Sequence, residues 1–308
     1  MTRKILIVLL VMLMIITSAM AENEETILII GDSLTYGEEY ANTLRNRLTD
    51  NKKVVSFGQG SIDSLNMIAI QGGIQLFVEP FDIPQDRRSS EVKLYTNIDT
   101  HSVGWLGLKS TQGLNPVSID GVRGDITVSF DENYKNVHYF FTRAEEGEKH
   151  SISRPTVVHT DIMNHYRDSI LVIWLGANDT SGYNNTLADA EKMATELYYY
   201  IMKAVSYNGN DKYIVLGLTV DPPTLVDGVN KYLAKMFGYH FIDLKRYLVE
   251  YGLSDAGIIP THKDLKSLSE GSVPFSLMQD DMVHFLDIGY EVIGNLLYEK
   301  GVENNYWK

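Results

Sequence analysis

Residues 26–37 read TILIIGDSLTYG, and this stretch decides the fold. Its first five residues are apolar or β-branched, a run too short for an uncapped helix but right for a strand buried on both faces. Gly31 ends the run, and Asp32 and Ser33 follow at the carboxyl end of what would be a parallel strand. Open α/β sheets bind their ligands at that edge. Ser33 is therefore a candidate nucleophile, although Asp and Ser are also favoured as helix N-caps.

Strands and helices are predicted to alternate on both sides of this stretch and again in the second half of the chain. Short apolar runs predict further strands at residues 53–57, 169–175, 212–218 and 240–244. Apolar side chains at helical spacing predict helices at residues 38–50, 186–207, 225–237 and 288–298. This alternation indicates an α/β fold with a parallel sheet. Residues 252–280, rich in Gly, Ser and Pro, are expected to form a long loop.

Residues 65–165 interrupt the α/β alternation. They contain no long helical pattern, and a crossover between parallel strands normally needs far fewer residues. Runs at 125–130 and 137–141, joined by a polar turn, instead predict a β-hairpin. Side chains alternate between the two faces of a strand, so Tyr139 and Phe141 share one face, which we expect to form a core. Phe140 lies on the other face, and the sequence leaves open whether it packs against the protein or stacks on a sugar. We expect a β-rich subdomain inserted into a discontinuous α/β domain made of residues 22–64 and 166–308.

The N-terminus has the three regions of a secretory signal peptide. Arg3 and Lys4 precede an apolar run at residues 5–16, and Ala19 and Ala21 form an A-x-A cleavage site. Residues 1–21 are expected to be removed on export, which predicts a secreted, periplasmic or cell-surface protein without stable membrane insertion. The alternative is an uncleaved anchor, which the run disfavours because a bilayer span usually needs ~20 residues.

Composition excludes several classes of function. The 308 residues carry a formal net charge of −13, which argues against nucleic acid as a partner. Cysteine is absent, so thiolate chemistry and disulfides are excluded. The G-x-S-x-G elbow and the glycine patterns that bind nucleotides are also missing. His159, Asp161 and His165 match no compact metal-ligand spacing, and we expect no metal there.

Other polar residues supply the groups that a serine nucleophile requires. A serine hydroxyl needs a base, and the base needs a third group to fix its tautomer. Asp281 and His284 are three residues apart, so on one side of a helical turn they could meet. The developing oxyanion needs hydrogen-bond donors, for which the backbone amides of Ser33 and Gly60 and the side chain of Asn178 are suitable.

Four segments of the sequence resemble blocks I, II, III and V of the SGNH/GDSL hydrolase family. They are Gly31-Asp32-Ser33-Leu34, the glycine-containing residues 56–60, Gly176-Ala177-Asn178-Asp179 and Asp281-Met282-Val283-His284. The resemblance implies a three-layer α/β/α sandwich with five parallel strands in the order 2-1-3-4-5. It also implies a serine esterase without cofactor, in which Ser33 is the nucleophile, His284 the base and Asp281 the group that orients it. Ser33, Gly60 and Asn178 then correspond to the oxyanion donors.

Residues next to these blocks carry further expectations. Block II is shorter here than in the family, which leaves Gly58 as an alternative to Gly60 for the oxyanion donor. Asp32 is expected to hold its turn by accepting backbone hydrogen bonds, and Asp179 is expected to cap the helix that follows it.

The function that we predict is a secreted esterase acting on a small-molecule or glycan ester, with acetyl groups on carbohydrate as the favoured substrate. A lipase or lysophospholipase of the same mechanism is one alternative. A weakly active glycan-binding module is another. The sequence does not determine the oligomeric state.

Overall fold

The fold centres on a parallel sheet of five strands. The computed structural model describes residues 25–48, 52–98, 106, 113–131, 137–220 and 222–307, so the predicted signal peptide lies outside the described residues. The strands are β1 (Glu25–Gly31), β2 (Lys52–Gly58), β12 (Ile170–Trp174), β13 (Tyr213–Leu216) and β14 (Phe241–Ile242). They lie in the order β2-β1-β12-β13-β14, which is 2-1-3-4-5 when these strands are numbered along the chain. The expected α/β class is confirmed.

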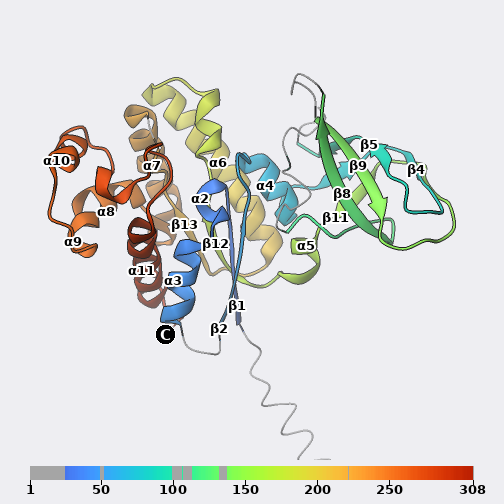
Figure 1. Cartoon of the computed structure of the whole chain (residues 1–308), viewed down its shortest axis with the longest axis horizontal. Coiled ribbons are helices and arrows are strands. Elements are labelled where there is room, and N and C mark those ends of the chain that lie inside the picture. Colours follow the sequence, from blue (N-terminus) through green and yellow to red (C-terminus); the bar gives the residue numbers. More distant parts are fainter. Residues whose placement is uncertain are drawn as a thin grey trace, which may run out of the picture.

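Helices cover both faces of this sheet (Figure 1). One face carries α3 (Glu39–Arg47) and α11 (Asp287–Glu303), and the other carries α4 (Ser64–Gln71), α6 (Leu187–Asn208) and α7 (Pro223–Phe237). Because side chains alternate along a strand, Ile27 and Ile29 pack with α3 and α11. Leu28 and Ile30 pack with the opposite set. Burial on both faces explains the unbroken apolar run in β1.

The β-rich part lies between α4 and β12 in the sequence and extends to one side of the sandwich in Figure 1. Its strands are β3 (Leu76–Val78), β4 (Phe81–Ile83), β5 (Ser90–Val92), β6 (Leu94–Thr96), β7 (Val117–Ile119), β8 (Val122–Phe130), β9 (Val137–Arg143), β10 (His150–Ile152) and β11 (Thr156–His159). Seven of them form an antiparallel sheet in the order β5-β9-β8-β7-β11-β3-β6, and β4 pairs with β10. The predicted hairpin is β8–β9.

The core of the β-rich part is continuous with one side of the sandwich. Tyr139 and Phe141 are 2% and 1% exposed, which confirms that they are core residues. They belong to the same buried apolar cluster as Leu28 and Ile30 of β1. A short helix, α5 (Asp161–His165), returns the chain to the sheet, and Thr160 at its N-cap donates a hydrogen bond to the carbonyl of Ile70 in α4 (2.5 Å).

The segment after β14 differs from the predicted loop. It contains α8 (Leu244–Glu250), α9 (Gly252–Asp255), α10 (His262–Ser269) and the short 3₁₀ helix η3 (Phe275–Leu277). A capping box begins α10: Thr261 Oγ1 accepts from Asp264 N, and Asp264 accepts from Thr261 N. Asp264 also accepts from Ser276 N (2.7 Å), which folds the following chain back onto α10. Local capping therefore organises a polar segment that composition alone identifies as a loop.

Candidate active site

Ser33 is the first residue of α2 (Ser33–Tyr36), the single helical turn that follows β1. Its Oγ lies 2.9 Å from Nε2 of His284. Nδ1 of the same imidazole lies 2.6 Å from Oδ2 of Asp281. The structure thus brings together, in one hydrogen-bonded chain, the three residues that the sequence suggested as nucleophile, base and orienting acid.

The turn that carries Asp281 and His284 is not helical, which corrects the expectation of a helical turn. Asp281 Oδ1 accepts hydrogen bonds from the backbone N–H groups of Val283 (2.9 Å) and His284 (3.0 Å), and Met282 between them has φ 54°. The α11 helix begins later, at Asp287. Asp281 thus accepts three hydrogen bonds, one from the His284 side chain and two from the backbone. Together they lower the pKa of Asp281 to about 2, and the side-chain hydrogen bond has the largest effect. The carboxylate is therefore charged at neutral pH.

Gln279 supports this turn and was not singled out by the sequence. Its backbone N–H donates to the carbonyl of His284 (2.8 Å), and its Nε2 donates to the carbonyl of Phe285 (2.9 Å). Met278 and Phe285 form an antiparallel bridge beside it. No sequence motif marks such a residue, because its role depends on how the chain folds back on itself after η3.

Asp32 holds the turn at the nucleophile. It is the N-cap of α2, and its Oδ1 accepts from the backbone N–H of Leu34 (3.0 Å), which confirms the expected structural contact. Asp32 is fully buried. Burial raises the pKa of Asp32 to about 7, and the nearby charge of Asp179 adds to the rise, while the hydrogen bond from Leu34 opposes it.

A cleft of about 490 Å³ opens at Ser33. It is lined by Ser33, Tyr36, Gly37, Glu39, Gln59, Gly60, Ser61, Gln279, His284 and Tyr290. All of these residues belong to the α/β sandwich, and none comes from residues 65–165. The set contains one carboxylate, that of Glu39, and no lysine or arginine. The only permanent charge in this lining is therefore negative.

Of the two glycines suggested as oxyanion donors, Gly60 lines the cleft and Gly58 does not. A Cβ on Gly58 would lie 2.3 Å from the backbone N of Tyr36, so this glycine allows the end of β2 to pack against α2. A Cβ on Gly60 would meet no atom within 4 Å. Gly60 therefore has no packed neighbour on the side that a Cβ would occupy, in contrast to Gly58.

Asn178 is held close to the same loop but is not a lining residue of the cleft. It begins the 3₁₀ helix η1 (Asn178–Gly182), and its Nδ2 donates to the carbonyl of Ile62 (2.8 Å). A side-chain amide carries two hydrogens, so this hydrogen bond leaves a second donor on the same nitrogen.

Asp179 does not cap the helix that follows it, which corrects that expectation. Thr186 caps α6 instead, by accepting from Asp189 N. The carboxylate of Asp179 accepts from Ser64 N (3.1 Å) and Ser64 Oγ (2.9 Å), at the first turn of α4. Burial raises the pKa of Asp179 to about 6.

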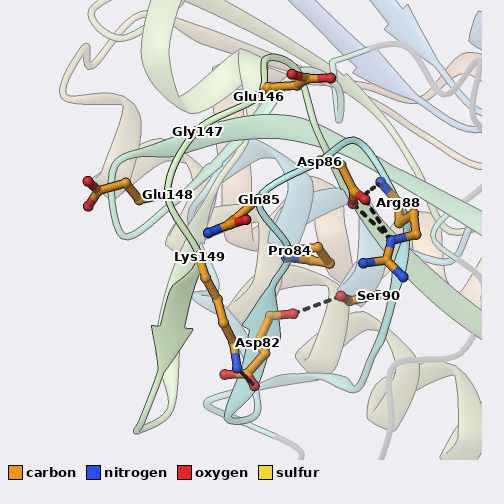
Figure 2. Close-up of a pocket in the computed structure, with 10 residues that line it drawn as sticks. All are labelled: Asp82, Pro84, Gln85, Asp86, Arg88, Ser90, Glu146, Gly147, Glu148 and Lys149. Atoms are coloured by element: carbon orange, nitrogen blue, oxygen red, sulfur yellow. Dashed lines mark hydrogen bonds and ion pairs between the residues drawn. The ribbon is translucent and has the colours of Figure 1, made fainter.

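A second and larger cavity, of about 1130 Å³, lies in the β-rich part. Figure 2 shows its lining residues: Asp82, Pro84, Gln85, Asp86, Arg88, Ser90, Glu146, Gly147, Glu148 and Lys149. Its cations are paired, since Arg88 Nε lies 2.8 Å from Asp86 and Lys149 Nζ lies 2.7 Å from Asp82. The lining contains no histidine to act as a base for Ser90. Within the described residues, no group of three or more His, Asp or Glu side chains could hold a metal ion.

Comparison with known proteins does not show to which family this chain belongs. No protein-family model and no curated protein matches the chain. A solved structure described as "Peptidoglycan O-acetylesterase in action, 5 min" is similar at 12% sequence identity over 92% of each chain, with a TM-score of 0.37. That TM-score is too low to transfer a property of that protein to this chain.

Proposed function

We propose that this chain is a serine esterase that hydrolyses carboxylic esters through an acyl-serine intermediate. The observation that carries the proposal is the chain of hydrogen bonds from Ser33 Oγ to His284 Nε2 (2.9 Å) and from His284 Nδ1 to Asp281 (2.6 Å), at the wall of an open cleft. A serine hydroxyl is a weak nucleophile unless a base within hydrogen-bond reach accepts its proton.

In the proposed reaction, Ser33 Oγ attacks the ester carbonyl while His284 Nε2 accepts its proton. The charged carboxylate of Asp281 keeps Nδ1 protonated and stabilises the imidazolium that forms. The oxyanion accepts hydrogen bonds from the backbone of Ser33 and Gly60 and from the side chain of Asn178. His284 then donates its proton to the departing alcohol. Water, activated by the same imidazole, hydrolyses the acyl-serine and restores the enzyme.

For the substrate, we propose a short acyl group, such as acetyl, on a carbohydrate. Gly37, Gly60 and Ser61 are small residues and leave room near Ser33 for a short acyl group. Gln279 is exposed, and the amide oxygen and second N–H of its side chain, beyond the one bonded to Phe285, are suited to hydroxyl groups. A long acyl chain would favour an apolar wall, and the only large apolar surfaces in this lining are two tyrosines. These features favour a glycan esterase over the lipase alternative.

We further propose that the enzyme acts outside the cytoplasm. The support is the signal-peptide pattern of residues 1–21. In the described part of the chain, no helix has the length and apolar character to cross a membrane.

The test uses the chain from Glu22 onward and p-nitrophenyl acetate. Wild-type protein should release nitrophenol, and Ser33→Ala should lower kcat by about 10⁴-fold or more. A fluorophosphonate probe should label Ser33, as located by mass spectrometry. Ser90→Ala, which alters a serine of the other cavity, is the matched control and should retain full activity. Hydrolysis that persists in Ser33→Ala would refute the proposal.

If the wild type is active, the same assay on a panel of substrates tests their class. Acetylated polysaccharides should be better substrates than phospholipids or long-chain esters. The opposite ranking would support the lipase alternative.

A further inference from the structure

Three hydrogen bonds tie together the loops that carry Gly60 and Asn178. Asn178 Nδ2 donates to Ile62 O (2.8 Å), and the neighbouring carboxylate of Asp179 accepts from Ser64 N (3.1 Å) and Ser64 Oγ (2.9 Å). Ile62 and Ser64 follow Gly60 closely in the sequence, and both are buried. The relative position of Gly60 and Asn178 therefore depends on contacts made by Asp179 as well as by Asn178.

The surroundings of Asp179 do not favour a charge. Two other carboxylates face it, Asp63 from the N-cap of α4 and Asp32 from the end of β1. Two phenols from the α6 side, those of Tyr183 and Tyr200, face it as well. No lysine or arginine of the described residues makes an ion pair with Asp179. An ionised carboxylate is costly in such a place, so its ionisation destabilises the fold at neutral pH.

The α4 helix does not need Asp179 as a cap. Asp63 already occupies the N-cap position, and its carboxylate accepts from Asn66 N (2.7 Å) and Asn66 Nδ2 (2.9 Å). The second carboxylate comes from a distant part of the chain, after β12, and binds Ser64 through both its N–H and its hydroxyl. Its contacts therefore join two loops, whereas those of Asp63 stay within one helix.

We propose that Asp179 is a positioning residue that fixes Gly60 relative to Asn178 and does so best as a carboxylate. The inference rests on the proposed function, because these donors matter only if Ser33 generates an oxyanion. An ionised carboxylate oxygen accepts both hydrogen bonds from Ser64, and each is stronger than a hydrogen bond to a neutral acceptor. Protonation weakens both, and the loop that carries Gly60 is then held less firmly.

The experiment compares Asp179→Asn and Ser64→Ala with Asp63→Asn, which removes a carboxylate from the start of the same helix without removing a hydrogen bond to the loop after β12. On p-nitrophenyl acetate, Asp179→Asn and Ser64→Ala should lower kcat by ~10-fold to 10²-fold with KM changed by less than about twofold. Asp63→Asn should retain its kcat. At pH 8, Asp179→Asn should not unfold at a lower temperature than the wild type, because it removes an unfavourable charge.

The pH profile separates positioning from simple structural damage. The ratio of wild-type to Asp179→Asn activity should be largest above pH 7 and should shrink as pH falls through about 6, where Asp179 gains a proton. A constant ratio with a lower unfolding temperature, or an unchanged kcat in Asp179→Asn, would overturn the inference while the esterase activity stands. Absence of Ser33-dependent hydrolysis in the wild type would overturn both proposals.

Discussion

The cleft at Ser33 and the cavity in the β-rich part are both open to solvent, but the side chains that line them make different contacts. The cavity has more than twice the volume, about 1130 Å³ against about 490 Å³. The two cations of its lining are paired, Lys149 with Asp82 and Arg88 with Asp86. In the cleft, an imidazole faces a serine hydroxyl, and Glu39 makes no ion pair with a described residue. The candidate active site is therefore the smaller of the two. It is identified by a serine hydroxyl and an imidazole within hydrogen-bond distance of each other, and not by its volume.

The segments that form the cleft and those that form the cavity are also held in place by different contacts. The cleft is built from loops after β1 and β2 and before α11. The first and the last of these loops are fixed by hydrogen bonds between backbone groups and the side chains of Asp32, Asp281 and Gln279. The two segments around the cavity are joined by Arg143, whose Nη1 donates to the carbonyls of Pro84 (2.8 Å) and Glu148 (2.9 Å), and by a backbone hydrogen bond from Gly147 N to Gln85 O (2.9 Å). Substitutions in the two regions should therefore affect different properties, catalysis in one and local stability in the other.

The largest expected effect is the fall in kcat caused by the substitution Asp281→Asn. An asparagine would not stabilise the imidazolium and would favour the wrong tautomer of His284, so kcat should fall by about 10³–10⁴-fold at neutral pH. Hydrolysis of p-nitrophenyl acetate measures the loss. The matched control is Asp280→Asn, one residue away, because no hydrogen bond joins Asp280 to His284 among the described contacts. Equal losses in the two variants would show that the charge of the loop matters and not the specific contact.

The residues of this hydrogen-bonded chain could be predicted from the sequence because each lies in a short segment with a local pattern. Ser33 follows an apolar strand and a glycine, and Asp281 and His284 keep a fixed spacing. The five parallel strands were predictable for the same reason, since buried strands form short unbroken apolar runs.

Contacts between distant segments could not be predicted in this way. The role of Asp179 depends on Ser64, which is 115 residues away in the sequence. Gln279 acts through the fold-back of the chain onto Phe285. The α10 helix was missed although Thr261 and Asp264 have capping-box spacing, because its polar composition outweighed that local signal. None of the described residues that line the cleft belongs to the β-rich part.

The second prediction contrasts a buried carboxylate of the sandwich with an exposed one of the cavity. The pKa of Asp32 is raised to about 7 by burial, so its ionised form destabilises the fold, and the cost grows as pH rises from about 4 through 7. Asp32→Asn keeps an N-cap acceptor and removes that cost. Above pH 7 it should be more stable than the wild type by the order of 2–4 kcal/mol, and near pH 4 the difference should vanish.

The control for this prediction is Asp82→Asn, because the pKa of Asp82 is shifted in the opposite direction to that of Asp32. The hydrogen bond from Lys149 lowers the pKa of Asp82, so the ionised form is the favoured one in the fold. Asp82→Asn should therefore show no gain in stability at high pH. Urea unfolding of both variants between pH 4 and 8 makes the comparison. A gain for Asp82→Asn, or none for Asp32→Asn, would contradict the assigned environments.

The third prediction concerns Arg143→Ala. Loss of its hydrogen bonds to the carbonyls of Pro84 and Glu148 should lower the free energy of unfolding by about 1–3 kcal/mol. The activity on p-nitrophenyl acetate should stay unchanged, because no residue of the cavity lines the cleft. Arg143→Lys is the conservative variant and should recover part of the stability. A parallel fall in kcat would mean that the two regions are coupled.

The smallest expected effect tests the charge of the cleft wall. At about 4 Å in water, a unit positive charge on the substrate gains ~1 kcal/mol from a carboxylate, a factor of about five in affinity. Glu39→Gln should therefore lower kcat/KM for a cationic ester by about fivefold and leave a neutral ester nearly unchanged. Added salt should reduce the difference, because exposed charges are screened. Glu146→Gln makes the same substitution at the wall of the cavity and should change neither rate. If it lowers the rate on the cationic ester as much as Glu39→Gln does, the effect comes from the overall negative charge of the protein and not from the cleft.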